Sequence, residues 1–364
     1  MIVIGTDTHK RTHTCGAVSA ATGQLAAELT ATAREPGFRE LLAWGRSLDE
    51  ERIWAIEDCR HVSGSLERFL VASGERVVRI PPKLMGQSRR GERSSGKSDP
   101  IDALAIARAA LREGPDTLPA AHLDERSLQV KLLLDHREDL VKARSEDQCR
   151  LRWHLHDLWP ELEIPAGALD RTVWLDRLAR KLARAEQGTR VRIARELLTE
   201  VRRRTRRAAE LEREIDALVK AQAPELLALE GCGALTAAKL IAETAGAGRL
   251  SSDAKFARLA GVAPIPASSG MRTRYRLDRG GNRQLNCALH RIAVTQGRCH
   301  APAREFLAKK QAEGKSRIEA LRCLKRHLAR RVWRLLNQSE IDLSMSNSVN
   351  PQRGSLAPQF AAVA

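Results

Sequence analysis

Short apolar stretches with few charges alternate with amphipathic stretches in the first third of the chain. The segment IVIGTDT at 2–8 has the composition of a buried strand. The predicted elements are, in chain order, strands over 2–8, 13–20 and 25–32, a helix over 36–48, a strand over 52–56, a helix over 62–73 and a strand over 76–80. Three strands in a meander, followed by alternating helix and strand, predict a ribonuclease-H-like fold, a mixed sheet with helices on its faces.

The rest of the chain has a helical pattern. Leucine and valine recur at three- and four-residue spacing over 124–159 and 170–221, with charges between them, which predicts two long helices. A break from Pro160 to Pro165 separates them and favours an antiparallel hairpin or coiled coil. The turn at 231–233, Gly-Cys-Gly, resembles a helix-hairpin-helix element, and a plain tight connection between helices explains it equally well.

These patterns divide the chain into four parts. A basic loop rich in glycine and serine over 87–98 precedes a helix from Ser98 to about Arg112, with Ser98 as its cap. A loop rich in proline, serine and glycine over 263–283 precedes three further helices near 284–296, 302–312 and 316–337. The predicted parts are an α/β domain over 1–115, the helical hairpin over 122–222, an all-α domain over 223–340 and a disordered tail over 343–364.

The amino-acid composition indicates which kinds of molecule the protein binds. The net charge of +17 and the pI of about 10.2 point to a polyanion, most simply nucleic acid. Aromatic residues make up only 3% of the chain, which argues against the stacking platforms of single-strand-binding proteins. No apolar run approaches the roughly 20 residues of a membrane helix, and no signal peptide is expected. Seven scattered cysteines without a CxxC pair fit reduced thiols, so we expect a cytoplasmic protein without membrane contact.

Four carboxylates occur where this fold would gather them. Asp7 lies in an apolar strand, where an acid is costly unless it is partnered, and Gly5 leaves space beside it. Glu57 ends the strand over 52–56, and Asp99 and Asp102 share one face at the start of a helix. A cluster of four carboxylates suits Mg²⁺ or Mn²⁺, and two such ions can activate an attacking oxygen and stabilise a leaving one in phosphodiester cleavage.

Each acid also has a plainer interpretation. Asp99 and Asp102 could merely stabilise the positive end of their helix, and Glu57 could be a solvated strand end. The order of the four acids along the predicted strands and helices favours the shared site. His9 lies near the predicted cluster and is left without a role, because a single histidine is more often packed or solvated.

A second candidate site lies in the loop over 263–283, within the predicted all-α domain. Ser268 and Ser269 precede Gly270, and a serine near strong positive charge can act as a nucleophile. The nearby arginines that could hold a phosphate are Arg272, Arg274, Arg276 and Arg279. Composition alone favours a flexible turn with phosphate contacts over a nucleophile. Arg203 and Arg206, in the helix over 170–221, are further candidates for nucleic-acid contact.

Several spaced motifs together resemble one known family. They are GTDTHK (5–10), AIEDCRH (55–61), GKSDPIDALAIAR (96–108), LEGCGALTAAKLIAE (229–243), GVAPIPASSG (261–270) and RGGNRQLNCALH (279–290). The chain resembles the DEDD-type insertion-sequence transposases, which join a RuvC-like N-terminal domain to a second, serine-containing transposase domain. The likeness extends over nearly all of residues 1–337.

The resemblance implies more than the residues alone. The four acids of the family fall on Asp7, Glu57, Asp99 and Asp102, and its catalytic serine falls on Ser269, with Ser268 adjacent. It implies a Mg²⁺-dependent site that cuts and rejoins donor and target double-stranded DNA through a covalent phosphoserine. It also implies guidance by a structured RNA encoded by the element, and a homo-oligomer, a dimer or tetramer, in bacterial cytoplasm at the nucleoid.

Two other functions stay open on the sequence. A RuvC-like nuclease or Holliday-junction resolvase would use the acids and leave Ser269 structural. A non-enzymatic basic protein that binds nucleic acid would need neither the acids nor a divalent ion, and the clustering of the acids argues against it.

Overall fold

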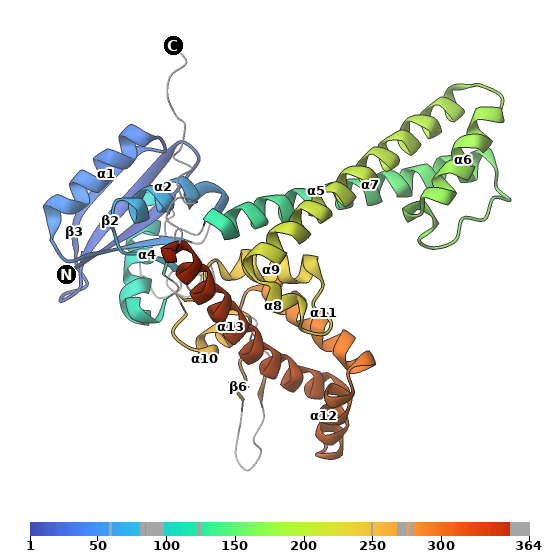
Figure 1. Ribbon diagram of the computed structural model, residues 1–364. Coiled ribbons are helices and arrows are strands. Elements are labelled where there is room, and N and C mark those ends of the chain that lie inside the picture. The colour runs from blue at the N-terminus through green and yellow to red at the C-terminus, as the bar shows by residue number, and fades with distance from the viewer. Residues whose placement is uncertain are drawn as a thin grey trace. The chain divides into compact units, whose positions relative to one another are not determined.

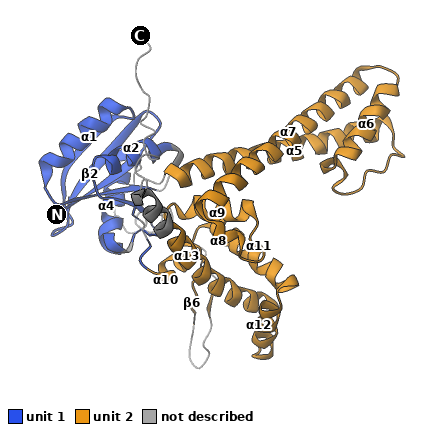
Figure 2. Cartoon of the chain, in the orientation of Figure 1, with its two compact units in different colours: residues 1–124, 248–251 blue, residues 125–247, 252–364 orange. Residues whose placement is uncertain are grey.

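The computed structural model describes residues 1–57, 60–80, 84, 98–118, 120–121, 125–248, 250–267, 275–276, 278 and 280–349, without the side chains of 60, 61, 117 and 340–349. The chain divides into two compact units (Figure 2). Unit 1 contains residues 1–124 and 248–251, and unit 2 contains residues 125–247 and 252–364.

Unit 1 is built on a five-stranded mixed sheet (Figure 1). Its strands are β1 (Ile2–Thr8), β2 (Thr12–Ser19), β3 (Leu25–Thr32), β4 (Arg52–Glu57) and β5 (Val77–Ile80), in the spatial order β3-β2-β1-β4-β5. The first three strands run antiparallel as a meander, and β4 and β5 lie parallel to β1. This is the ribonuclease-H-like order that the alternation of strands and helices predicts.

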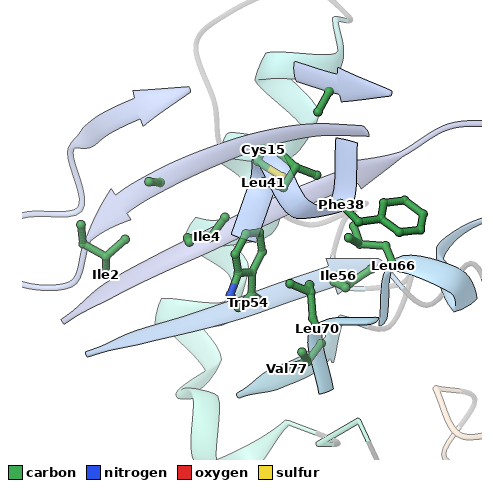
Figure 3. Packing of buried hydrophobic residues seen from close by; sticks show 12 residues of the cluster. Ile2, Ile4, Cys15, Phe38, Leu41, Trp54, Ile56, Leu66, Leu70 and Val77 are labelled. Carbon is green, nitrogen blue, oxygen red and sulfur yellow. The ribbon is translucent and has the colours of Figure 1, made fainter. Parts of the chain in front are cut away.

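The two faces of the sheet are covered by different helices. Strand alternation sends Ile4 and Ile56 to one face, where they pack with Trp54 and with side chains of α1 (Glu35–Leu48) and α2 (Arg60–Ala72) (Figure 3). The opposite face, which includes Val3 and Ala55, packs on α4 (Asp99–Glu113). A short 3-10 helix, η1 (Pro115–Thr117), follows α4.

Helix α4 lies directly against β1 because Gly5 has no side chain. A Cβ atom at Gly5 would lie 2.1 Å from the carbonyl oxygen of Ala103 and 2.4 Å from the backbone nitrogen of Ala107. The alanines of α4 on this side, including Ala107, are fully buried. The close approach therefore fixes the first turn of α4 beside the strand that carries Asp7.

A buried carboxylate lies at the opposite end of the sheet. The Glu75 side chain is 3% exposed and accepts hydrogen bonds from Trp54 Nε1 at 3.0 Å, from Arg52 at 2.6 and 2.7 Å and from Arg46 at 3.1 Å. Burial would raise the pKa of Glu75, but these donors outweigh burial and hold the pKa below its ordinary value. The protein itself thus neutralises this acid.

Unit 2 begins with two long antiparallel helices, α5 (Glu125–Leu158) and α7 (Thr189–Gln222) (Figure 1). Ion pairs between the helices join Arg137 to Glu212 at 2.7 Å and Arg204 to Asp147 at 2.9 Å. At the far end of the hairpin, η2 (Ala168–Asp170) and α6 (Thr172–Arg184) complete a core of leucines with α5 and α7.

The single helix expected over 170–221 is wrong, because the chain breaks between α6 and α7. Gly188 is the extended N-cap of α7, and the Gln187 side chain donates to the carbonyl oxygens of Leu182 and Ala185 at 3.4 and 2.6 Å. These bonds satisfy carbonyl groups at the end of α6, which makes the interruption stable.

The remainder of unit 2 is mainly helical. Its elements are α8 (Pro224–Leu227), α9 (Ala234–Thr244), α10 (Asp253–Leu259), β6 (Ile265–Pro266), β7 (Tyr275–Arg276), α11 (Arg283–Cys299), α12 (Ala301–Ala312) and α13 (Arg317–Val349). The loop predicted over 263–283 contains the short antiparallel ribbon β6–β7. Helix α13 does not end near residue 337, and so the part of the predicted tail over 343–349 is helical.

Two glycines join the segments on either side of that ribbon. A Cβ atom at Gly281 would lie 2.1 Å from the backbone nitrogen of Gly261, so only glycine permits this contact. Asn286 adds hydrogen bonds to the carbonyl oxygens of Ala260 and Gly261, each at 3.0 Å. Within the described residues, no helix is both long and apolar enough to cross a membrane.

Candidate active site

The structure places Asp7 near the end of β1, on the side of the sheet that faces α4. Its residue is 6% exposed, and the neighbouring residues of the strand are buried as well. The side chain is the charged member of an otherwise neutral strand, and the missing side chain at Gly5 lets α4 pack directly against this strand. A carboxylate in this position loses most of its hydration and needs a partner.

The first turn of α4 supplies two further acids. Asp102 is 6% exposed, whereas the side chain of Asp99 is about half exposed at 51%. Ser98 is the N-cap residue of α4, but its side chain makes no capping hydrogen bond, contrary to the sequence expectation. Its carbonyl oxygen instead accepts the first helical bond from the Asp102 backbone nitrogen at 3.0 Å.

His9 connects the strand to the helix. Its Nε2 lies 3.1 Å from Asp7 Oδ2 and 3.3 Å from Asp99 Oδ1. Ligand atoms of these three residues all lie within 4.8 Å of one another, the spacing of a possible metal site. The sequence analysis assigns His9 no role. Its position two residues after Asp7, directly past the end of β1, is the signal that could have indicated one, because strand alternation places such residues on the same face.

The acids of this cluster repel one another. Burial raises the pKa of Asp7 above its ordinary value, and the negative charges of Asp102 and Asp99 raise the pKa further. His9 opposes both effects through its charge and its hydrogen bond. The folded protein therefore holds negative charge here at an energetic cost, and a bound cation would relieve it.

Glu57 ends the neighbouring strand β4, at the same end of the sheet as Asp7. The parallel register pairs Gly5 with Ala55 and Thr6 with Ile56, so Glu57 comes level with Asp7. Alternation along β4 points Glu57 to the face that Ala55 shares with α4, and its residue is half-buried. The four predicted acids thus come from two adjacent strand ends and one helix start.

The chemistry of this donor set fits a hard divalent cation. Carboxylate oxygens are the ligands that Mg²⁺ and Mn²⁺ prefer, and a single nearby imidazole is compatible with Mn²⁺. The buried and half-exposed acids offer oxygens from both the strand side and the solvent side. The cluster is therefore a candidate site for a divalent cation.

The predicted serine site falls mostly outside the described residues. Ser268 and Ser269 lie there, as do Arg272, Arg274 and Arg279. Arg276 is described, in β7, and its residue is exposed. Its guanidinium group makes no ion pair among the residues that the structure describes.

The arginine-rich stretch of α7 is largely paired with acids. Arg203 bonds Glu200 on its own helix at 2.8 Å, although it is exposed to solvent. The other paired arginines of this stretch are Arg202 with Asp176, Arg204 with Asp147 and Glu200, and Arg207 with Glu210. Arg206 is exposed and has no ion pair within the described part of the chain. Of the two predicted nucleic-acid contacts in α7, Arg206 alone presents an uncompensated charge.

The sequence analysis missed a buried polar network around α9. Lys239, 8% exposed, pairs with Glu138 and donates to Gln284 Oε1 at 2.9 Å. Glu243, one turn later and 7% exposed, accepts from Lys131 at 3.0 Å and from Asn282 Nδ2 at 2.6 Å. Charged residues inside the alanine-rich run were a signal of the same kind as Asp7. The network joins α5, α9 and the start of α11.

The Gly-Cys-Gly turn connects the four-residue α8 to α9. Gly231 has a φ of +81°, and a Cβ atom there would lie 3.0 Å from the Thr295 side chain of α11. Gly233 is the N-cap of α9. Gln296 of α11 donates to the carbonyl oxygen of Glu230 at 2.8 Å, so the turn is held against α11.

Two relatives with known sequences align with most of the chain. Two relatives are proteins of unknown character: a 44.8 kDa protein of insertion element IS116 from Streptomyces clavuligerus, 26% identical, and a 42 kDa protein of insertion element IS900 from Mycobacterium paratuberculosis, 25% identical. Each alignment covers 93% of this chain and 96% of the relative. A solved structure of Thermus thermophilus RuvC with a Holliday junction substrate matches 31% of this chain and 96% of its own, at 17% identity and a TM-score of 0.25.

Two family models match separate parts of the chain. A DEDD transposase model of the IS110 type matches residues 4–160, which include all four acids. A second model, described as the transposase of the IS116/IS110/IS902 family, matches residues 223–308, which include the β6–β7 ribbon. The chain belongs to the IS116/IS110/IS902 family of transposases, enzymes that cut and recombine DNA.

Proposed function

We propose that this transposase cuts and rejoins the DNA of its own insertion sequence with a divalent-metal site formed by Asp7, Glu57, Asp99 and Asp102. The observation that carries the proposal is the meeting of Asp7 and Asp99 at His9, with Asp102 close enough for its charge to act on Asp7, on the face of the sheet to which Glu57 also points. A passive binder of polyanions has no use for several acids gathered in one place, where their like charges raise the pKa of the buried Asp7.

Each residue of the site has a distinct task. A bound Mg²⁺ or Mn²⁺ would supply Lewis-acid activation of an oxygen nucleophile and stabilisation of the leaving oxygen. Asp7 and Asp102, both buried, hold their oxygens in fixed positions, and Asp99 offers its oxygen from the exposed side. The positive end of α4 lowers the cost of placing two carboxylates in its first turn. His9 keeps the acids of the strand and the helix together.

The finer part of the proposal concerns Ser269. Its hydroxyl oxygen would bond to the scissile phosphorus while the bond from phosphorus to the leaving sugar oxygen breaks, which gives a phosphoserine linkage and a free DNA hydroxyl. The arginines Arg272, Arg274, Arg276 and Arg279 would hold the phosphate and stabilise its developing charge. Support comes from the family resemblance and from the exposed, unpaired Arg276.

The proposal includes partners beyond the DNA. A structured RNA from the element would pair with donor and target DNA, and the protein would hold the duplexes through their shape and backbone. The helical hairpin of α5 and α7 would assemble copies of the chain into a dimer or tetramer. The basic composition supports nucleic-acid binding in general.

The deciding experiment is a strand-transfer assay with the element's flanking DNA and RNA, with and without Mg²⁺. We expect transfer by the wild type only with the ion, and a loss of at least about a hundredfold in Asp102→Asn, since metal-site losses of this size are common. Activity of Asp102→Asn without added metal would contradict the proposed metal site.

A second readout separates the serine from the acids. We expect a covalent protein–DNA adduct with the wild type and with Ser268→Ala, and none with Ser269→Ala. Cleavage by Ser269→Ala without any adduct would instead identify a metal-dependent nuclease or junction resolvase that leaves the serine unused.

A further inference from the structure

A cavity of about 400 Å³ lies in unit 2 where α13 begins, and we call it the α13 pocket. Its walls come from the segment that precedes β6, from β7, from α12 and from the first turns of α13. The lining residues include Val262, Pro264, Tyr275, Arg276, Arg322 and Cys323. This volume is within the range of about 300–1,000 Å³ that is usual for small-molecule sites.

The lining of the α13 pocket has an excess of positive charge. Arg276, Lys315 and Arg322 make no ion pair among the residues that the structure describes. The carboxylate of Glu319, which also lines the cavity, accepts from Ser316 N at 2.9 Å and from Ser316 Oγ at 2.8 Å, and its charge acts on Arg322 and Lys315 from beyond ion-pair distance. Because six lysines and arginines line the cavity together with this one acid, the lining favours an anion.

The buried part of the wall is also cationic. Lys325 is 6% exposed and donates to Asn286 Oδ1, an uncharged acceptor. Burial and the nearby charge of Arg322 lower the pKa of Lys325. Arg326 binds Asp253 through Nη2 at 2.9 Å, whereas its Nη1 is buried without a hydrogen-bond partner in the described structure. A buried donor without a partner is costly, so this N–H group of Arg326 is available to a ligand in the α13 pocket.

An apolar wall and one aromatic ring face the same cavity. Val262, Ala263 and Pro264 form the wall, and Tyr275 is 59% exposed although it is a large side chain. Tyr275 is the single tyrosine of the chain. Aromatic residues make up only 3% of the chain, which argues against an extended stacking platform but is compatible with a single stacking position. Stacking of a base on an aromatic ring contributes about 1–3 kcal/mol, and arginine binds phosphate through paired hydrogen bonds.

We propose that the α13 pocket binds one unpaired nucleotide of a DNA strand, with the base against Tyr275 and Pro264 and the phosphate on Arg276 and Arg322. The choice of DNA rests on the proposed function, because strands that are cut and rejoined must leave their duplex for part of the reaction. The combination of apolar wall, exposed ring and unpaired cations fits a nucleotide better than a bare phosphate, which would need no ring.

Cys323 in the pocket wall provides a direct measurement. Full-length protein without divalent ions would be alkylated in the presence of a DNA single strand of about 12 nucleotides, and each thiol would be followed by mass spectrometry. We expect the strand to slow alkylation of Cys323 at least about fivefold and to leave the exposed Cys149 of α5 unchanged. A strand of abasic nucleotides should protect much less, since it offers phosphates without bases.

Variants test the assigned side chains. Tyr275→Ala and Arg322→Ala should each weaken binding of the DNA strand about tenfold, whereas Arg331→Ala, an exposed arginine of the same helix outside the pocket, should weaken it less than about twofold. Equal losses in Arg322→Ala and Arg331→Ala would overturn the pocket. Equal protection by the abasic strand, or protection by an RNA strand alone, would overturn the unpaired deoxynucleotide as its ligand.

The assay is independent of the metal site. Asp102→Asn should bind the strand as the wild type does, because no divalent ion is present. A failure of strand transfer with intact protection of Cys323 would thus reject the catalytic proposal alone, and the reverse result would reject only the pocket.

Discussion

At the scale of single residues, burial combined with charge separates sites that look alike in sequence. Asp7 and Glu75 are both buried acids of unit 1, but Glu75 is surrounded by donors, whereas Asp7 has one hydrogen bond with His9 and the charges of two other acids nearby. Asp7 could be chosen as a candidate site residue from the sequence, because an acid in a neutral buried strand is costly unless it has a partner. The arginine partners of Glu75 could not, because they come from separate elements and meet only in the folded chain. The pairing of Arg203 with Glu200 is different, because the two residues lie three apart on α7 and their spacing could have predicted it.

Glu75 should make unfolding strongly dependent on pH. We expect Glu75→Gln to lower the free energy of unfolding by about 2 kcal/mol at neutral pH, since hydrogen bonds to charged groups are lost. The pKa of Glu75 is lower in the folded than in the unfolded chain. Its contribution is therefore present above the unfolded pKa of about 4.3 and disappears as the pH falls through the folded pKa.

Denaturant unfolding of both proteins at neutral pH and over a series of decreasing acid pH values tests this expectation, because the difference between their stabilities should shrink as the pH falls through the folded pKa. Glu51→Gln is the matched control, since the side chain of Glu51 is 79% exposed, and its effect should stay within about 0.5 kcal/mol. A difference between wild type and Glu75→Gln that persists unchanged in acid would show that packing, not charge, is lost.

At the scale of elements, hydrophobic periodicity predicted the strands and helices of unit 1 and the two long helices of unit 2. It failed where local hydrogen bonds interrupt an unbroken pattern, as at Gln187 and Gly188. It also failed for the ribbon β6–β7, which is two residues long in each strand and too short for any period. The positions that decide the site are contacts between elements, and Gly5 is the clearest of them.

Gly5→Ala should separate α4 from β1 and disturb the acid cluster. The new methyl group would overlap backbone atoms of α4, which cannot move like the end of a side chain. We expect a loss of about 1–3 kcal/mol in stability and a smaller rise in unfolding temperature when Mg²⁺ or Mn²⁺ is added. Gly16→Ala is the control on β2, because the new Cβ atom would lie 3.5 Å from its nearest neighbour in α4, the backbone nitrogen of Leu104. Identical behaviour of the two variants would contradict the role given to Gly5.

The exposed arginines of α7 should differ in their contribution to nucleic-acid binding. Binding of a non-specific DNA duplex would be measured over a range of salt concentrations. Arg206→Ala should flatten the salt dependence by about one unit if its phosphate contact is lost, and Arg203→Ala by less, because Glu200 already neutralises Arg203. If neither variant changes the slope, this face of α7 does not contact phosphate.

At the scale of the whole molecule, the chain combines two units that were expected to carry different parts of the chemistry. The acids belong to unit 1, and Ser269 falls in the sequence range of unit 2. The family could be recognised from the sequence because spaced motifs in both units match it together. Oligomer formation and the RNA partner depend on surfaces of other molecules, so neither composition nor a single chain reveals them.

Mixing two inactive variants tests whether the two sites cooperate between subunits. Asp102→Asn and Ser269→Ala should each be inactive alone in strand transfer. A mixture should recover part of the activity, because a mixed oligomer can pair an intact acid site with an intact serine from another copy. Asp102→Asn mixed with Asp7→Asn is the control and should stay inactive. No recovery in the first mixture would place both sites within one copy.

The two ends of the unit 1 sheet are electrically unlike. At one end the carboxylate of Glu75 is balanced by arginines, and at the other the negative charges of Asp99 and Asp102 act on the buried Asp7, with His9 opposing them in part. The net charge of +17 favours a phosphate backbone, whereas the carboxylates of Asp7 and Asp99 oppose it locally. At the proposed metal site a cation would therefore have two tasks, because it would bring the phosphate close to the acids as well as activate it.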